Sequence, residues 1–189
     1  MRWETHIAVS LLLFFSLLLL GIDIKYSILV PLLSVLPDVD LLFGIRYHRK
    51  IFHNAWFLLL ISLSIFYLTN DFILSLFAGA GILVHLLFDG LTPTGITLFW
   101  PFKKGKIKGN IKTGGPIDKF LFYFFLIVTS LIFSLLLIFK YGIVLLSNIY
   151  LNIALLWICS LPLIFFLILS MKEVASEIIK FKKQKLKSK

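Results

Sequence analysis

Long apolar runs separated by short polar breaks dominate the sequence. Several of the runs approach or exceed the ~20 residues that an α-helix needs to cross the hydrocarbon core of a bilayer. A strand-like alternation of apolar and polar positions does not organise them. The pattern therefore predicts an all-α, polytopic membrane bundle of about six helices, at residues 7–20, 26–36, 55–68, 72–91, 120–139 and 142–170.

The second run is the shortest. Residues 26–36 cannot cross a bilayer core of ~30 Å at a rise of ~1.5 Å per residue, and Pro31 is expected to bend them. We interpret this run as the return half of a short helical hairpin formed with the first run. In a five-helix alternative this run does not cross, and His6 is left on the membrane face opposite the other ionisable residues.

Polar and small residues mark the limits of the predicted helices. Residues 69–71 are expected to form a tight turn, and residues 92–95, Thr-Pro-Thr-Gly, to end the fourth helix. Gly79 and Gly81 are expected to allow close helix packing. We predict one membrane-embedded domain over residues 1–171.

Composition supports this class and excludes others. The chain is 60% hydrophobic and 16% aromatic, with a mean hydropathy of +1.02, whereas soluble domains are about half apolar. The single cysteine, Cys159, cannot form an intramolecular disulfide. The net charge of +10 comes from basic residues beside membrane segments, so we expect contact with membrane lipid and no nucleic acid.

The basic residues predict the topology. With six helices, 17 of the 19 lysines and arginines lie on the side that holds both termini, and only Lys25 and Lys140 lie opposite. The positive-inside rule then predicts a multi-pass cell-membrane protein with both termini in the cytoplasm. Residues 172–189 would form a basic cytoplasmic tail.

Ionisable residues are rare in this chain and are not spread evenly. Residues 36–53 contain two of the nine acidic residues and two of the four histidines. His85 and Asp89 lie four residues apart on one face of the fourth predicted helix. Ionisable groups at membrane depth are costly and usually mark a functional site. The predicted topology brings these residues to the cytoplasmic face together with the remaining histidine, His6.

Imidazole and carboxylate groups without cysteine indicate a divalent metal site. Zinc is our first choice, with manganese or iron as alternatives. The candidates exceed one tetrahedral site, so one or two ions fit, and paired ions are a recurrent device for phosphoester hydrolysis. The candidate ligands are His6, Asp38, Asp40, His48, His53, His85 and Asp89.

Taken together, these motifs resemble a known family. They are His6 at the head of the first helix, Pro37-Asp38-Val39-Asp40, His48-Arg49 with His53, His85-x-x-x-Asp89 with Thr92 and Gly95, and Trp100-Pro101. Over roughly residues 1–120 this combination is similar to the YdjM-type (DUF457-like) membrane-bound metal-dependent hydrolases. That family is in turn similar to zinc-dependent phospholipase C and P1 nuclease. The resemblance implies a helical metallohydrolase acting on a phosphoester.

The sequence departs from the secreted relatives because it has no histidine after His85. Asp118 could supply a late acidic ligand, or it could cap the helix expected to follow it.

Two functional hypotheses remain from the sequence. In the first, the protein hydrolyses a phosphoester, such as a phospholipid headgroup, through a metal-activated water. Asp40 or His48 would then act as general base or orient a ligand, from a loop outside any helix, and Arg49 would bind phosphate through its planar fork. In the second, the same cluster serves a non-enzymatic metal carrier or sensor.

Overall fold

Helices make up most of the described structure. The computed structural model describes residues 1–43, 49, 51–102, 105–139 and 164–179. Within these residues the β-structure is limited to an isolated bridge between Ile96 and Ile107. The labelled helices are α1 (Trp3–Leu19), α2 (Ile24–Ser27), α3 (Leu29–Ser34), the 3-10 helix η1 (Leu36–Phe43), α4 (Ala55–Thr69), α5 (Phe72–Gly90) and α6 (Pro116–Phe139), and residues 164–179 are also helical.

Side-chain caps define the turn between α4 and α5. Asn54 caps the start of α4, because its side-chain oxygen accepts a hydrogen bond from the Phe57 amide at 2.9 Å. Asn70 ends α4 in the left-handed conformation, with φ of 52°. Asp71 then caps α5 by accepting from the Leu74 amide at 3.0 Å. The predicted tight turn at residues 69–71 is confirmed.

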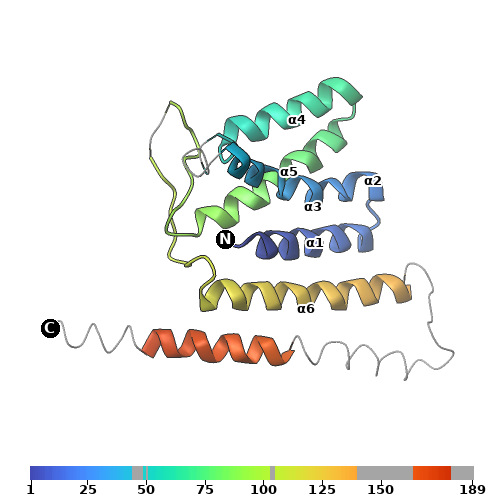
Figure 1. Ribbon diagram of the computed structural model, residues 1–189. Coiled ribbons are helices and arrows are strands. Elements are labelled where there is room, and N and C mark those ends of the chain that lie inside the picture. Colours follow the sequence, from blue (N-terminus) through green and yellow to red (C-terminus); the bar gives the residue numbers. More distant parts are fainter. Residues whose placement is uncertain (44–48, 50, 103–104, 140–163, 180–189) are drawn as a thin grey trace.

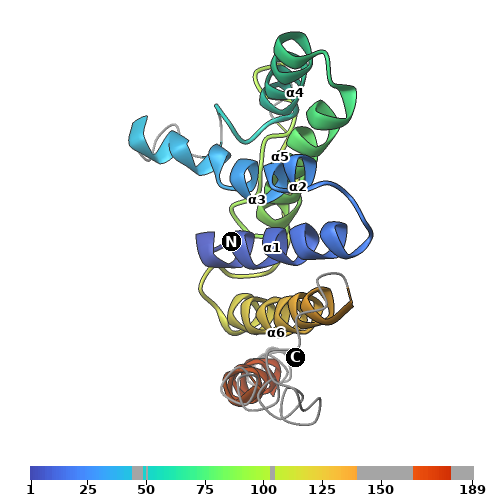
Figure 2. The same cartoon turned by 90° about the vertical axis from the view of Figure 1, so that its right-hand side faces the viewer.

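The helices follow one another as layers. In Figures 1 and 2, α1 lies between α6 on one side and α3 on the other, and α5 connects this group to α4. The helix at residues 164–179 lies along the far side of α6, where Phe166 stacks on Tyr123 with ring centroids 5.3 Å apart. The start of α1, the end of α5 and the start of α6 consequently meet at one end of the bundle.

Two glycines of α5 allow close packing, as the sequence predicted. A Cβ atom on Gly79 would lie 2.6 Å from the Ser62 hydroxyl of α4. A Cβ atom on Gly81 would lie 2.7 Å from the Val30 carbonyl oxygen of α3. Both distances are shorter than any ordinary carbon–oxygen contact, so glycine lets α5 approach both neighbours closely.

The outer surface is strongly apolar. No side chain of α4 is buried, and Leu60 and Leu63 are 61% and 62% exposed. By length and composition two of the described helices can span a membrane, at Phe72–Gly90 and Pro116–Leu137, whereas Trp3–Leu19 and Ala55–Thr69 are shorter apolar helices. A large exposed apolar surface of this kind is suited to lipid.

The all-helical fold class is confirmed, with three differences in detail. The predicted run 26–36 is divided between α2, α3 and η1. Helix α6 begins at Pro116, earlier than predicted, because proline is well suited to the first turn of a helix. Of the predicted helix 142–170, residues 142–163 lie outside the described residues, and the part from 164 continues to 179, past the predicted end of the domain.

Candidate metal site

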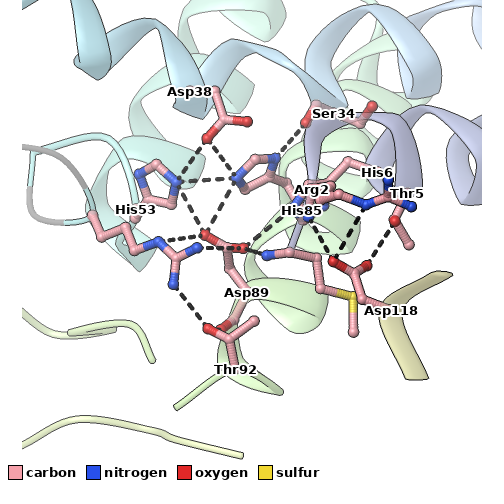
Figure 3. A network of polar contacts seen from close by, with 12 residues as sticks. Arg2, Thr5, His6, Ser34, Asp38, His53, His85, Asp89, Thr92 and Asp118 are labelled. Atoms are coloured by element: carbon pink, nitrogen blue, oxygen red, sulfur yellow. Dashed lines mark hydrogen bonds and ion pairs between the residues drawn. The ribbon is translucent and has the colours of Figure 1, made fainter. Parts of the chain in front are cut away.

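Polar residues gather where the helix ends meet (Figure 3). They come from several separate elements, so the tertiary fold and not a local motif assembles them. His6 lies in α1, Asp38 and Asp40 in η1, His53 just before α4, and His85 and Asp89 in the last turns of α5. All except Asp38 are at most 1% exposed.

Four ligand atoms form the centre of the site. The Nε2 atoms of His53 and His85 lie 3.0 Å apart. Asp38 Oδ1 is 3.5 Å from each of these nitrogens. Asp89 Oδ2 lies 3.5 Å from His53 Nε2 and 3.8 Å from His85 Nε2.

The separations around the two histidine nitrogens are of the size found between neighbouring ligands of a small divalent ion. Zinc binds imidazole nitrogen and carboxylate oxygen at ~2.0–2.2 Å, so the ligand atoms of a tetrahedral site are roughly 3.3–3.6 Å from each other. The five distances given above range from 3.0 to 3.8 Å. Asp89 Oδ2 is also a buried oxygen that accepts no hydrogen bond within the described structure. Asp38, His53 and His85 form a first group of ligand atoms that could hold a metal ion.

The other nitrogen of each histidine fixes the orientation of its ring. His85 Nδ1 lies 2.6 Å from the carbonyl oxygen of Ser34, which can only accept, so Nδ1 donates. His53 Nδ1 lies 3.0 Å from Asp40 Oδ2. When both rings are neutral, each therefore turns its Nε2 lone pair toward the same point. Two lone pairs 3.0 Å apart repel each other unless a proton or a metal ion lies between them.

Asp40 lies deeper than the sequence suggested. We expected it in a loop open to substrate and outside any helix, but it lies in η1 and is fully buried. Its Oδ2 accepts from the Arg49 amide at 2.9 Å and contacts His53 Nδ1. A carboxylate on the outer nitrogen of a metal-binding histidine orients the ring and raises its basicity. The geometry favours this positioning role for Asp40.

Burial and charge act in opposite directions on the pKa values of Asp38 and His53. Burial alone would raise the pKa of Asp38, but hydrogen bonding with His53 and the charges of His85, His6 and His53 outweigh it and lower that pKa below its usual value. For His53, burial would lower the pKa, but contacts with Asp38 and Asp40 and the charge of Asp89 raise it above its usual value. Asp38 is therefore readily ionised, and His53 is readily protonated.

Arg49 lies against the same carboxylate that faces the two histidines. Its Nε is 3.2 Å from Asp89 Oδ2, and another guanidinium nitrogen donates to Asp89 Oδ1 at 3.3 Å. The remaining guanidinium nitrogen donates to the Thr92 hydroxyl at 2.8 Å. The backbone of Arg49 is left-handed, with φ of 63°, a conformation that is unfavourable for residues other than glycine. The amide bond to Asp40 helps to hold it there.

His6 belongs to a second group of potential ligands, with His85 and Asp89. Its ring stacks on that of His85 at 4.0 Å, and its Nε2 lies 3.2 Å from Asp89 Oδ1. The same oxygen also contacts Arg49 and the α-amino group of Met1. Because two cationic groups already contact this oxygen, the first group is better suited than the second to hold an ion.

Two other candidates lie apart from this centre. Asp118 accepts from the Thr5 hydroxyl at 2.7 Å and the Gly114 amide at 2.8 Å, and so connects the start of α6 to α1. It lies inside the first turn of α6, so the predicted cap position was wrong. His48 lies outside the described residues.

Sequence reasoning missed two contributors. The Ser34 carbonyl orients His85, and a backbone acceptor leaves no signal in the sequence. Asn54 caps α4 immediately after His53. An asparagine directly before an apolar run is a recognisable helix-start signal, so this residue could have been found.

Comparison with known proteins agrees with the membrane-helix architecture. The family described as YdjM inner membrane protein matches residues 1–175. No curated protein and no solved structure matches the chain. The family match covers nearly the whole sequence, including every ligand of the candidate metal site. The chain therefore belongs to the YdjM inner membrane protein family.

Proposed function

We propose that this protein is a membrane-embedded, metal-dependent hydrolase that cleaves a phosphoester. The observation that carries the proposal is the group formed by Asp38, His53 and His85, whose ligand atoms lie 3.0–3.5 Å from one another, as ligands of one divalent ion do. The resemblance to zinc-dependent phospholipase C and P1 nuclease is in keeping with an all-helical enzyme of this class.

Each residue has a definite part in the proposal. His53, His85, Asp38 and Asp89 hold the ion, with zinc as first choice and manganese or iron as alternatives. A bound divalent ion supplies an acidified water and an electrophile for the phosphoryl oxygen. Asp38 is the most open ligand, with 20% of its side chain exposed. Substrate and water are therefore expected to approach from its side.

We assign proton transfer and phosphate binding to two further residues. Asp40 orients His53, which leaves His48 as the candidate general base. Arg49 offers a planar fork that matches two phosphate oxygens. Its side chain is 12% exposed, so it lies between the buried carboxylate and the surface.

Exposed aromatic side chains support a lipid substrate. Trp56 and Phe102 are 46% and 83% exposed and pack edge to face with ring centroids 5.6 Å apart. The Ala55 amide, at the start of α4, donates to the Leu98 carbonyl at 2.8 Å. This bond joins the helix that carries Trp56 to the segment that leads to Phe102. Aromatic side chains of this kind favour the headgroup region of a membrane. We therefore propose a phospholipid headgroup as the substrate class.

The alternative function, a metal carrier or sensor, also has support. Four protein ligands complete a tetrahedral shell, and closed shells are typical of structural sites. Hydrolysis requires that Asp38 move aside or that the ion accept a fifth ligand. The two functions differ in whether the metal-loaded protein turns over any phosphoester.

The test is hydrolysis of phospholipids and of a generic phosphodiester by the purified protein in detergent. We expect activity that a chelator abolishes, that added zinc or manganese restores, and that Asp38→Ala removes. Activity that survives both chelation and Asp38→Ala would contradict the proposal. Stoichiometric metal without turnover of any phosphoester would favour the carrier or sensor.

A further inference from the structure

We propose that Arg49 and the metal ion compete for one oxygen of Asp89, so that metal loading releases the guanidinium for an incoming phosphate. The inference rests on the proposed function and adds an order to it, with metal first and the anionic substrate second. In this proposal Arg49 couples the binding of the metal to the binding of phosphate.

The competition arises at Asp89 Oδ2. This atom faces His53 Nε2 at 3.5 Å and His85 Nε2 at 3.8 Å, and it also lies 3.2 Å from Arg49 Nε. An ion bound to this oxygen at ~2.0–2.2 Å would lie at most about 5.4 Å from Arg49 Nε. Two cations would then share one carboxylate.

Solvent screens these two cations only weakly, because the groups that hold them are largely buried. Asp89 is 1% exposed and the Arg49 side chain 12% exposed. Like charges repel strongly at this separation when solvent is excluded. The other Asp89 oxygen, Oδ1, already accepts from Arg49 at 3.3 Å and also contacts the α-amino group of Met1 and His6 Nε2, so it offers no free position for the Nε group that the ion displaces.

The Arg49 side chain is partly exposed, at 12%. Its amide is fixed by Asp40 at 2.9 Å, so the backbone remains in place while the side chain moves. The contacts that keep the guanidinium inward are those to Asp89 and the one to the buried Thr92 hydroxyl at 2.8 Å. Once the ion neutralises Asp89, the Thr92 contact alone is a weak restraint.

Thermodynamic linkage makes the effect measurable. If the arginine opposes the ion, then removing its charge must tighten metal binding. A phosphate that captures the released guanidinium must favour metal binding, and metal must favour phosphate binding by the same factor.

The first experiment measures zinc affinity by competition with a chromophoric chelator. We expect Arg49→Gln to bind zinc about tenfold more tightly than wild type, within the usual range of coupling between sites. Thr92→Val should shift affinity in the same direction, while Thr92→Ser, which keeps the hydroxyl, should match wild type. Equal or weaker zinc binding by Arg49→Gln would overturn the inference.

The second experiment uses the wild-type chain alone. Phenylglyoxal labelling of Arg49, read by mass spectrometry, should increase severalfold when zinc is added. Unchanged or reduced labelling of a zinc-loaded protein would show that the arginine stays on Asp89, which overturns the inference but not the metal site. A wild-type protein that binds no zinc, manganese or iron would instead contradict the proposed function.

Discussion

At the scale of single residues, Asp89 connects most of the site. One of its oxygens faces His53, His85 and Arg49, and the other contacts His6 and the Met1 α-amino group. A carboxylate buried this deeply needs positive partners to remain charged. Its partners come from three segments, namely the start of α1, the segment between η1 and α4, and α5 itself, so the site depends on the tertiary fold.

Asp40 provides a sharp test of how the ligands are oriented. Asp40→Asn keeps the shape of the side chain but removes the charge that faces His53 Nδ1 at 3.0 Å. We expect metal affinity to fall about 10–100-fold, because an oriented ring is a better ligand. Isothermal titration with zinc would measure it.

A matched control is Asp23→Asn. Asp23 caps α2 at the opposite end of α1, and asparagine caps a helix equally well. Metal affinity should stay at the wild-type value in this variant. An Asp40→Asn protein that binds zinc as tightly as Asp23→Asn does would contradict the positioning role.

Metal affinity should also depend on pH through His53. Its raised pKa means that a proton occupies the ring at pH values where a free histidine, with a pKa of 6.5, is already neutral. Protons and metal compete for the nitrogen. Apparent zinc affinity should therefore decline as pH falls through the raised pKa of His53, beginning above pH 6.5.

Zinc titrations from pH 8 down to 5.5 would show this decline. In Asp40→Asn, one cause of the raised pKa is gone, so the onset of the decline should shift to lower pH. An onset at the same pH in both proteins would show that Asp40 does not set the proton affinity of the site.

The sequence predicted the candidate ligands but not the contacts that orient them. Five of the predicted ligands, His6, Asp38, His53, His85 and Asp89, lie together because ionisable residues in an apolar chain are costly unless they meet. The deep position of Asp40 and the pairing of Arg49 with Asp89 could not be predicted. The position of Asp40 depends on the path of η1, and the pairing of Arg49 depends on its left-handed backbone. Neither feature can be read from the spacing of residues in the sequence.

At the scale of elements, α5 organises the bundle. It packs on α3 and α4 and delivers His85 and Asp89 to the site. Its boundaries were predictable from the cap at Asp71 and the Thr-Pro-Thr-Gly break. The start of α6 was not, because polar residues obscure the helix from Pro116 to Lys119 although proline marks its first turn.

Gly81 tests the α3–α5 contact. In Gly81→Ala the new Cβ atom would lie 2.7 Å from the Val30 carbonyl oxygen, so α3 must shift. We expect destabilisation of about 1–3 kcal/mol, as for other overpacked cores. Thermal unfolding in detergent would measure it.

Gly90→Ala is the matched control, because the nearest atom to its Cβ would lie at an ordinary 3.7 Å. This variant of the same helix should keep wild-type stability or exceed it, since alanine favours helix more than glycine does. Equal melting temperatures for Gly81→Ala and wild type would show that the two helices are less closely packed than the structure indicates.

At the scale of the whole molecule, the site lies where one set of helix ends meets. Which membrane face this end occupies remains a prediction from the basic residues, 17 of the 19 of which the predicted six-helix topology places on the side of the termini. We expect that side to be cytoplasmic.

Cysteine labelling in whole cells would test the topology. After replacement of Cys159 by serine, a cysteine at Lys106, in the loop before α6, should react with an impermeant reagent only after the membrane is opened. A cysteine at Asn70, in the α4–α5 turn, should react from outside. The reverse pattern would contradict the predicted orientation without affecting the geometry of the metal site.

The most direct test of the central claim is the metal content of the purified protein. After growth with zinc and extensive dialysis, we expect about one divalent ion per wild-type chain, because both groups of possible ligands need His85, whose Nδ1 already donates to Ser34. His85→Ala should lose most of it, whereas Asp71→Asn, at the other end of α5, should keep it. A His85→Ala protein with as much metal as wild type would show that the cluster is not the metal site.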